Sequence, residues 1–276
     1  MPEIKAPDGV MLHWEECGSG PTVLLTPYWA MHPSVFNPIE EVLSEHFRVI
    51  RFDERGAGHS ERVGPYDMAT GTSDLEAVCE VAGPVDVALC LVDSPNRAVR
   101  VASSAPDLLR SVVCIGAAPF GVGALSDSDS LLSSETVVRT FLQQIEADPR
   151  GAIRSALSGA NTALTEDEVR DRVQAQMDYI DAEAAAVRAR EWAMDTGGEE
   201  PGRAIGSRLT VCLSDTMGGS GSWFPSGAEM EPVVREVFPE AHVHWTGDGI
   251  VSAPQAVAEV IRDAVPASAE TYDRQP

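Results

Sequence analysis

Histidine, aspartate and serine side chains are the groups of this chain that could move protons or attack a substrate. An imidazole titrates near neutral pH and is the usual base that activates a hydroxyl or a water. The chain has six histidines: His13, His32, His46, His59, His242 and His244. His242 and His244 fall on one face of a strand-like run, which is typical of a packed or surface position. His32 lies in a loop that we expect to border a pocket.

Asp93 and Ser94 follow an apolar run at residues 85–92 that has the composition of a buried strand. Ser94 precedes Pro95, and a Ser-Pro pair is typical of a helix start, with serine as the N-cap and proline at the first helical position. A shifted nucleophile is the other role for Ser94. Asp93 could act as a nucleophile or a base, because carboxylates fill both roles in enzymes.

Alternating strand-like and helical segments position these residues. Apolar runs predict strands, and 3.6-residue periodicity with capping signals predicts helices. Strands are expected at 10–14, 22–25, 47–52, 85–92 and 109–116, and helices at 38–46, 73–81 (capped by Ser73) and 95–104. Repeated strand–helix–strand units of this spacing predict an α/β fold, a mostly parallel doubly wound sheet with helices on both faces.

The pattern changes between residues 126 and 202, where strand signals disappear. Helical periodicity covers 135–147, 151–157, 165–180 and 182–194, and Thr165 with Glu168 forms a capping box. The sheet resumes with strands at 209–213 and 242–245 and a helix at 254–265. We therefore expect a core of residues 1–121 and 204–276, with a helical cap inserted at 122–203.

The composition argues against nucleic acid, membranes and metal ions as partners of this chain. The 276 residues carry a formal net charge of −23, which disfavours nucleic acid and anionic membranes, because both require clustered Lys and Arg. No apolar stretch approaches the ~18 residues of a membrane span. Five cysteines without metal-type spacing and a polar N-terminus indicate a cytoplasmic protein with reduced thiols. We expect no metal or other cofactor, and leave a homodimer open.

Three stretches resemble the α/β-hydrolase superfamily. Residues 53–60 (DERGAGHS) match its D-x-R-G-x-G-x-S turn, and residues 73–78 match the helix before the nucleophile strand. Residues 27–32 (PYWAMH) resemble the P-x-W-x-x-H oxyanion loop of hydrolase-like domains, some of which are fused to bacterial cyclase domains. The resemblance implies an α/β-hydrolase fold with an inserted helical cap.

The same resemblance places the catalytic positions, and this chain departs from the family at each. The nucleophile turn G-x-S-x-G is replaced either by a turn centred on Asp93 or by one centred on Val92, and both registers stay open. Met217 stands at the position of the acid. The turn that carries the base keeps Asp248 and is followed by Ile250.

The departures predict a degenerate triad and an enzyme that does not hydrolyse. We expect a cofactor-free lyase, isomerase or cyclase acting on a small, largely apolar metabolite, with a pseudo-hydrolase that binds a ligand or partner as one alternative and a hydrolase with Asp93 as nucleophile as another. The candidate catalytic residues are Asp93, Ser94, Asp248 and His32. The candidate substrate-binding residues are Tyr28, Trp29, Met31, Val92, Met217, Trp223, Phe224 and Ile250.

Overall fold

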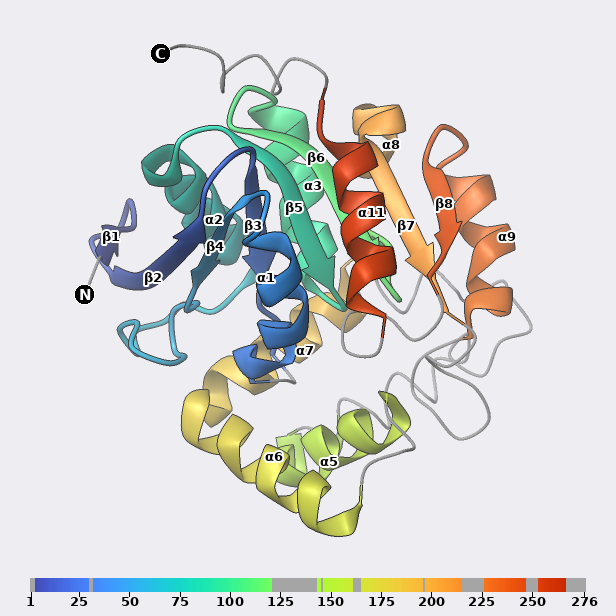
Figure 1. Ribbon diagram of the computed structural model, residues 1–276. Helices are drawn as coiled ribbons and strands as arrows, with labels where there is room; N and C mark the ends of the chain where they lie inside the picture. The colour runs from blue at the N-terminus through green and yellow to red at the C-terminus, as the bar shows by residue number, and fades with distance from the viewer. Residues whose placement is uncertain are drawn as a thin grey trace.

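The strands of the chain form one mixed sheet (Figure 1). The computed structural model describes residues 3–29, 32–120, 143–144, 146–160, 165–195, 197–214, 226–246 and 253–266. Its strands are β1 (Glu3–Lys5), β2 (Met11–Gly18), β3 (Thr22–Thr26), β4 (Arg48–Phe52), β5 (Val85–Leu91), β6 (Leu109–Ile115), β7 (Leu209–Leu213) and β8 (His242–Trp245). They lie in the order β1-β2-β4-β3-β5-β6-β7-β8. Pairs involving β1 and β2 are antiparallel and the other pairs are parallel, which confirms the predicted mostly parallel sheet.

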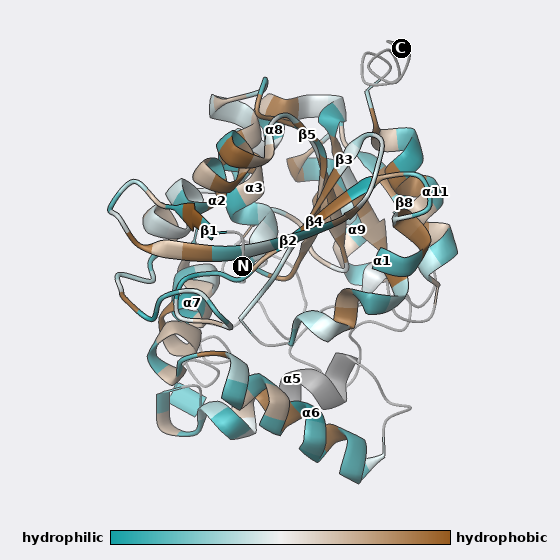
Figure 2. Ribbon diagram, turned by 60° about the vertical axis from the view of Figure 1, so that its left-hand side comes forward, coloured by the Kyte–Doolittle hydropathy of each residue, from teal (hydrophilic) through white to brown (hydrophobic). Residues whose placement is uncertain are grey.

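The centre of the sheet is buried on both faces. Every residue of β3, β5 and β7 is buried, as the continuous apolar runs in the sequence predict for strands covered by helices on either side. In Figure 2 the central strands β3 and β5 are mostly hydrophobic, and the surrounding helices carry polar as well as hydrophobic residues. The carboxyl ends of the parallel strands meet at one edge, where loops from different strands converge.

Helices cover both faces of the sheet. The helices among the described residues are α1 (Asn37–Leu43), α2 (Met68–Ala82), α3 (Ser94–Ser104), α5 (Pro149–Ala160), α6 (Glu166–Tyr179), α7 (Ala182–Met194), α8 (Glu199–Ile205), α9 (Gly227–Val237) and α11 (Pro254–Ala264), with short turns η1 (Pro33–Phe36) and η4 (Gly206–Arg208). α1 and α11 pack together on one face, and α2, α3 and α8 pack together on the other (Figure 1). No helix in the described part of the chain is long and apolar enough to span a membrane.

The helix α2 begins earlier than the sequence predicts. Asp67 caps it by accepting a hydrogen bond from the Thr70 backbone at 2.8 Å, so the expected N-cap, Ser73, lies inside the helix. The sequence pattern did not predict the start of this helix, because glycine and β-branched residues are weak helix formers and the segment contains Thr70, Gly71 and Thr72. A Cβ at Gly71 would lie 3.0 Å from the Arg97 side chain, so the glycine admits close packing of that arginine.

The helices α5, α6 and α7 lie beyond the carboxyl ends of the strands (Figure 1). α6 opens with the predicted capping box of Thr165 and Glu168, and α7 has the predicted bounds. The helix expected at 135–147 lies mostly outside the described residues. α8, which the sequence reasoning missed, packs against α3 of the core although the predicted cap boundary at residue 203 divides it.

Candidate active site

The turn between β5 and α3 has a strained backbone. Val92 has a φ of 50°, and it is the single non-glycine residue with positive φ in the described ranges. A β-branched residue in this conformation costs about 1–3 kcal/mol and persists only where the surrounding structure imposes it. Of the two registers that the sequence left open, the structure centres the strained turn on Val92, with Asp93 one residue further. The side chain at the centre of the turn therefore carries no nucleophile.

Ser94 is buried within this turn. Its Oγ donates a hydrogen bond to the Leu91 carbonyl at 2.8 Å and accepts one from the Leu91 N–H at 2.8 Å, and Thr26 Oγ1 lies 2.9 Å away. Asp93, not Ser94, occupies the N-cap position of α3, so the predicted cap is one residue too late. These contacts give Ser94 a role in closing the turn and favour that role over attack on a substrate.

Asp93 belongs to a buried ionic cluster, which we define as Glu54, Asp93, Arg97 and Arg188. The Arg97 guanidinium lies 2.9 Å from Asp93 Oδ2 and 2.8 Å from Glu54 Oε1. Arg188, which comes from α7, lies 2.7 Å from Glu54 Oε2. All four side chains are buried, and their formal charges cancel. The cluster thus joins the β5–α3 turn, the loop after β4 and helix α7.

Burial dominates the electrostatics of Asp93. Desolvation raises its pKa to about 6, opposed by the Arg97 charge and reinforced by Glu54. Burial also raises the pKa of the Tyr28 hydroxyl, and the Asp93 charge raises it further. Oδ1 of Asp93 accepts no hydrogen bond from the described residues, so this carboxylate retains an unused acceptor.

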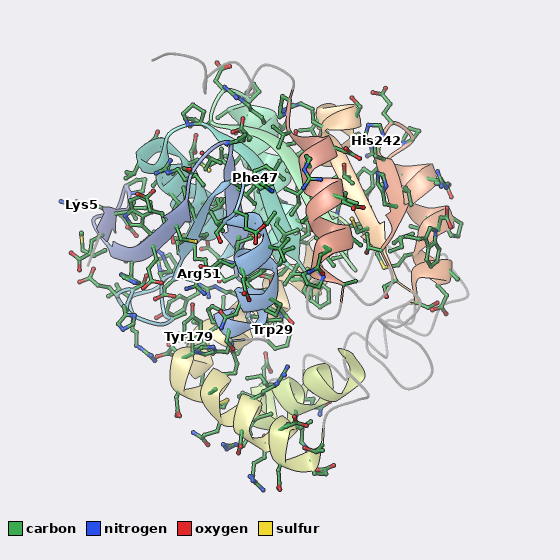
Figure 3. The ribbon with its side chains drawn as sticks, in the orientation of Figure 1. Lys5, Trp29, Phe47, Arg51, Tyr179 and His242 are labelled. Atoms are coloured by element: carbon green, nitrogen blue, oxygen red, sulfur yellow. The ribbon has the colours of Figure 1, made fainter. Side chains whose placement is uncertain are left out.

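The loop after β3 brings Tyr28 and Trp29 to the boundary between the sheet and the cap helices. Both are buried, and the Trp29 carbonyl accepts a hydrogen bond from Gln176 Nε2 of α6 at 2.8 Å. Figure 3 shows Trp29 and Tyr179 at this boundary. The loop that the sequence assigned to substrate binding is therefore in contact with the cap.

His32 lies apart from the ionic cluster. Its Nδ1 accepts a hydrogen bond from the Ser34 backbone at 3.2 Å, which caps η1, and its ring stands edge-on to Tyr179 with centroids 5.1 Å apart. Burial lowers the pKa of His32. No contact in the described part of the chain joins His32 to Asp93, so the structure does not bring these two candidate catalytic residues together.

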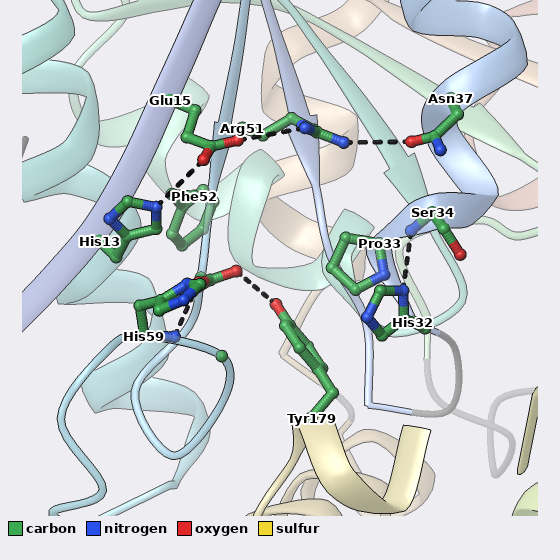
Figure 4. A pocket seen from close by; sticks show the side chains of 12 residues that line it. His13, Glu15, His32, Pro33, Ser34, Asn37, Arg51, Phe52, His59 and Tyr179 are labelled. Atoms are coloured by element: carbon green, nitrogen blue, oxygen red, sulfur yellow. Dashed lines mark hydrogen bonds and ion pairs between the residues drawn. The ribbon is translucent and has the colours of Figure 1, made fainter. Parts of the chain in front are cut away.

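A pocket of about 270 Å³, which we call the polar pocket because most of the residues that line it are polar, opens beside His32 (Figure 4). Its lining comes from β2, from the loop after β4, from η1 and from the end of α6: His13, Glu15, His32, Pro33, Ser34, Asn37, Arg51, Phe52, Asp53, Gly58, His59 and Tyr179. The sequence reasoning did not assign His13, Asp53 or Tyr179 to a site. The D-x-R-G turn was a signal for Asp53, whereas the strand pairing that brings His13 beside it is not visible in the local sequence pattern.

The remaining candidate residues lie outside the described part of the chain. They are Met31, Met217, Trp223, Phe224, Asp248 and Ile250. Their proposed roles stay predictions.

Curated proteins of known name resemble part of this chain. One is a pimeloyl-[acyl-carrier protein] methyl ester esterase of Nitrosomonas europaea, 28% identical over 144 residues, which are 49% of this chain and 54% of the esterase. Another is a 2-(acetamidomethylene)succinate hydrolase of Mesorhizobium japonicum, 27% identical over 62% of this chain and 60% of the relative. The matches span about half to three fifths of these relatives. No protein-family model matches the chain.

Solved structures resemble the chain over nearly its whole length. A bromoperoxidase from Bacillus anthracis matches with a TM-score of 0.75 and 16% identity, covering 95% of this chain and 98% of the other. An esterase from Exiguobacterium antarcticum matches with a TM-score of 0.76 and 17% identity over the same shares. At these identities the structures establish the fold.

The relatives correct the functional expectation drawn from the sequence. They are enzymes, in agreement with the expectation of an enzyme, but the two curated relatives described above and the Exiguobacterium antarcticum structure are named as hydrolases or esterases. The expected lyase, isomerase or cyclase and the inactive pseudo-hydrolase are therefore contradicted, and these relatives give the expected degenerate triad no support. The missing G-x-S-x-G motif was weaker evidence about the class of reaction than the similarity of the chain to named hydrolases. By its mostly parallel sheet with helices on both faces and its likeness to these solved structures, the chain has the α/β-hydrolase fold.

Proposed function

We propose that this protein hydrolyses a small carboxylic ester or a related acyl compound by direct attack of water. The observation that carries the proposal is the strained turn at Val92, with the buried Asp93 carboxylate beside it. A backbone this strained is typical of functional sites. Since valine cannot attack a carbonyl, water is the nucleophile in this proposal.

Asp93 supplies the base. Its raised pKa of about 6 leaves it ionised at neutral pH and more basic than an ordinary carboxylate, which suits proton removal from water. Arg97 fixes the position of Oδ2, while Oδ1 receives no hydrogen bond from the described residues. In the reaction, Oδ1 takes a proton as the water oxygen bonds to the carbonyl carbon, and the proton then goes to the departing alcohol.

Backbone N–H groups near Tyr28 and Trp29 polarise the carbonyl of the substrate in this scheme. Donors held in place before the reaction stabilise a developing oxyanion without the cost of reorganisation. Gln176 supports this loop by binding the Trp29 carbonyl. We place the reaction in the cytoplasm, because all five cysteines are free thiols, which suits a reducing compartment.

The substrate class follows from the relatives. One name refers to the methyl ester of a pimeloyl group carried on an acyl-carrier protein and the other to a succinate derivative, and both groups derive from short dicarboxylic acids. We therefore assign this chain a small acyl substrate with a modest leaving group.

The test is hydrolysis of p-nitrophenyl acetate, p-nitrophenyl butyrate and dicarboxylic acid monomethyl esters, with products identified by mass spectrometry. Asp93→Asn should lower kcat by about 100-fold or more, the usual contribution of a general base. Asp86→Asn is the matched control, because Asp86 is another buried aspartate that pairs with an arginine, Arg110, at 2.6 Å. It should keep its kcat.

Three results would contradict the proposal. The first is a wild-type protein that hydrolyses none of these esters. The second is Asp93→Asn with undiminished kcat. The third is a covalent intermediate, seen either as labelling by a fluorophosphonate serine probe or as incorporation of ¹⁸O into the Asp93 peptide after a single turnover in labelled water.

A further inference from the structure

The polar pocket contains a compact group of metal-ligand side chains outside the ionic cluster. His13, Asp53 and His59 each offer a ligand atom, and these atoms lie within 4.8 Å of one another. His59 Nδ1 is 3.5 Å from Asp53 Oδ2. Two ligands bound to zinc at 2.0–2.2 Å with a tetrahedral angle are about 3.4 Å apart, so this pair already has the required separation.

The backbone brings these residues together. The Asp53 N–H donates to the His13 carbonyl at 2.8 Å, and the His13 N–H donates to Ser60 Oγ at 2.8 Å. Gly58 has a φ of +53°, and a Cβ there would lie 2.2 Å from Asp53 Oδ2. The glycine of the D-x-R-G-x-G turn thus lets the carboxylate lie against the loop that carries His59.

Neighbouring groups orient the three side chains. His13 Nε2 is 3.4 Å from Glu15 Oε1, so a carboxylate contacts the imidazole of His13. Tyr179 donates its hydroxyl hydrogen to Asp53 Oδ1 at 2.7 Å, and the His59 N–H donates to Asp53 Oδ2 at 2.9 Å. A carboxylate behind a histidine and a donor behind a ligating carboxylate are the outer contacts that metal sites use to hold their ligands.

We propose that His13, Asp53 and His59 bind one divalent cation of the zinc class. Two imidazoles and one carboxylate suit zinc and its first-row neighbours, whereas magnesium prefers oxygen ligands in an octahedron. The Arg51 charge at the pocket is balanced by Glu15 at 3.2 Å and Glu40 at 3.0 Å. The three ligands all line the pocket, so the open coordination positions face a space that admits water or an oxygen ligand.

His13 and His59 would contribute differently to binding of the metal ion. His13 is buried and supplies a fixed ligand, while the side chain of His59 is 66% exposed and can turn to close the coordination. The site is independent of the proposed hydrolysis, because it uses none of the residues assigned to that reaction.

The test is zinc binding to the metal-free full chain by titration calorimetry, with magnesium as a second titrant. One zinc ion per chain should bind with saturation, and magnesium should not. His59→Ala should weaken zinc binding by at least about 10-fold. At about 100 times the dissociation constant, zinc should raise the Tm of the wild type by about 5 °C.

Two histidine variants serve as matched controls. His46→Ala and His242→Ala remove exposed imidazoles elsewhere, and His242 lies on β8, at the opposite end of the sheet from β2 (Figure 3). Both should bind zinc like the wild type. The proposal is overturned if the wild type shows no saturable zinc binding, if His59→Ala binds as tightly as the wild type, or if magnesium binds equally well.

Discussion

The ionic cluster and the polar pocket both gather charged side chains at the boundary between the sheet and the cap, but they differ in burial. In the cluster, two arginines balance Glu54 and Asp93, and all four side chains are buried. In the pocket, His59 is exposed and the groups face open space. Charge that is buried and paired fixes geometry, whereas charge that borders a pocket can exchange one partner for another.

The largest expected effect follows from breaking the cluster. Arg97→Ala leaves Glu54 and Asp93 buried without a shared counter-charge, so the free energy of unfolding should fall by about 3–5 kcal/mol. Urea unfolding measures the change. Arg170→Ala, which removes an exposed pair with Asp167, should change it by less than about 1 kcal/mol. Equal losses in the two variants would erase the distinction between the buried and exposed charges.

A smaller effect concerns the pH dependence of stability. Because the folded pKa of Asp93 is raised to about 6 from 3.8, the folded state binds its proton more tightly than the unfolded state. Stability therefore rises as pH falls from 7 toward 4, by at most about 3 kcal/mol for this group. The charges facing Asp93 are Arg97 of α3, Glu54 after β4 and Arg188 of α7, with the Tyr28 hydroxyl beside them.

The measurement is the difference in unfolding free energy between the wild type and Asp93→Asn across pH 4–7. Taking the difference cancels the titration of carboxylates common to both proteins. The wild type should gain stability relative to the variant as pH falls. A difference that stays constant, or that changes in the opposite direction, would contradict the raised pKa.

The smallest effect is expected in the pocket. His59→Ala removes a side chain that is 66% exposed, so without added metal the free energy of unfolding should change by less than about 0.5 kcal/mol. Urea unfolding in the presence of a chelator checks this. A loss above about 2 kcal/mol would mean that His59 is a structural residue like those of the cluster.

The sequence predicted the elements well where a single physical signal dominates. Continuous apolar runs located β3, β5 and β7, and a capping box located the start of α6. The start of α2 was missed because its first turn contains weak helix formers, although Asp67 caps it.

The sites were harder to predict because their partners are distant in sequence. Asp93 was a candidate, but the fold is needed to bring Glu54 to its partner Arg97 and Arg188 to Glu54. His13 lies beside Asp53 because β2 pairs antiparallel with β4. The hydrophobic pattern of each strand does not show which residues of the two strands face each other. The left-handed backbone of Val92 could not be read from a residue type that normally avoids it.

Arg188 also limits how far α7 can move away from the sheet. Its guanidinium pairs with Glu54 and donates a hydrogen bond to the Arg55 carbonyl at 2.6 Å. Moving α7 away from the sheet would therefore leave the buried Glu54 carboxylate without this partner. Separating such a pair costs several kcal/mol, which makes the lifted conformation rare. Substrate exchange by hinge motion of this helix would therefore be slow. Under the proposed hydrolysis, a substrate would have to reach Asp93 with α7 in place, so the position of this helix would limit the size of the substrate.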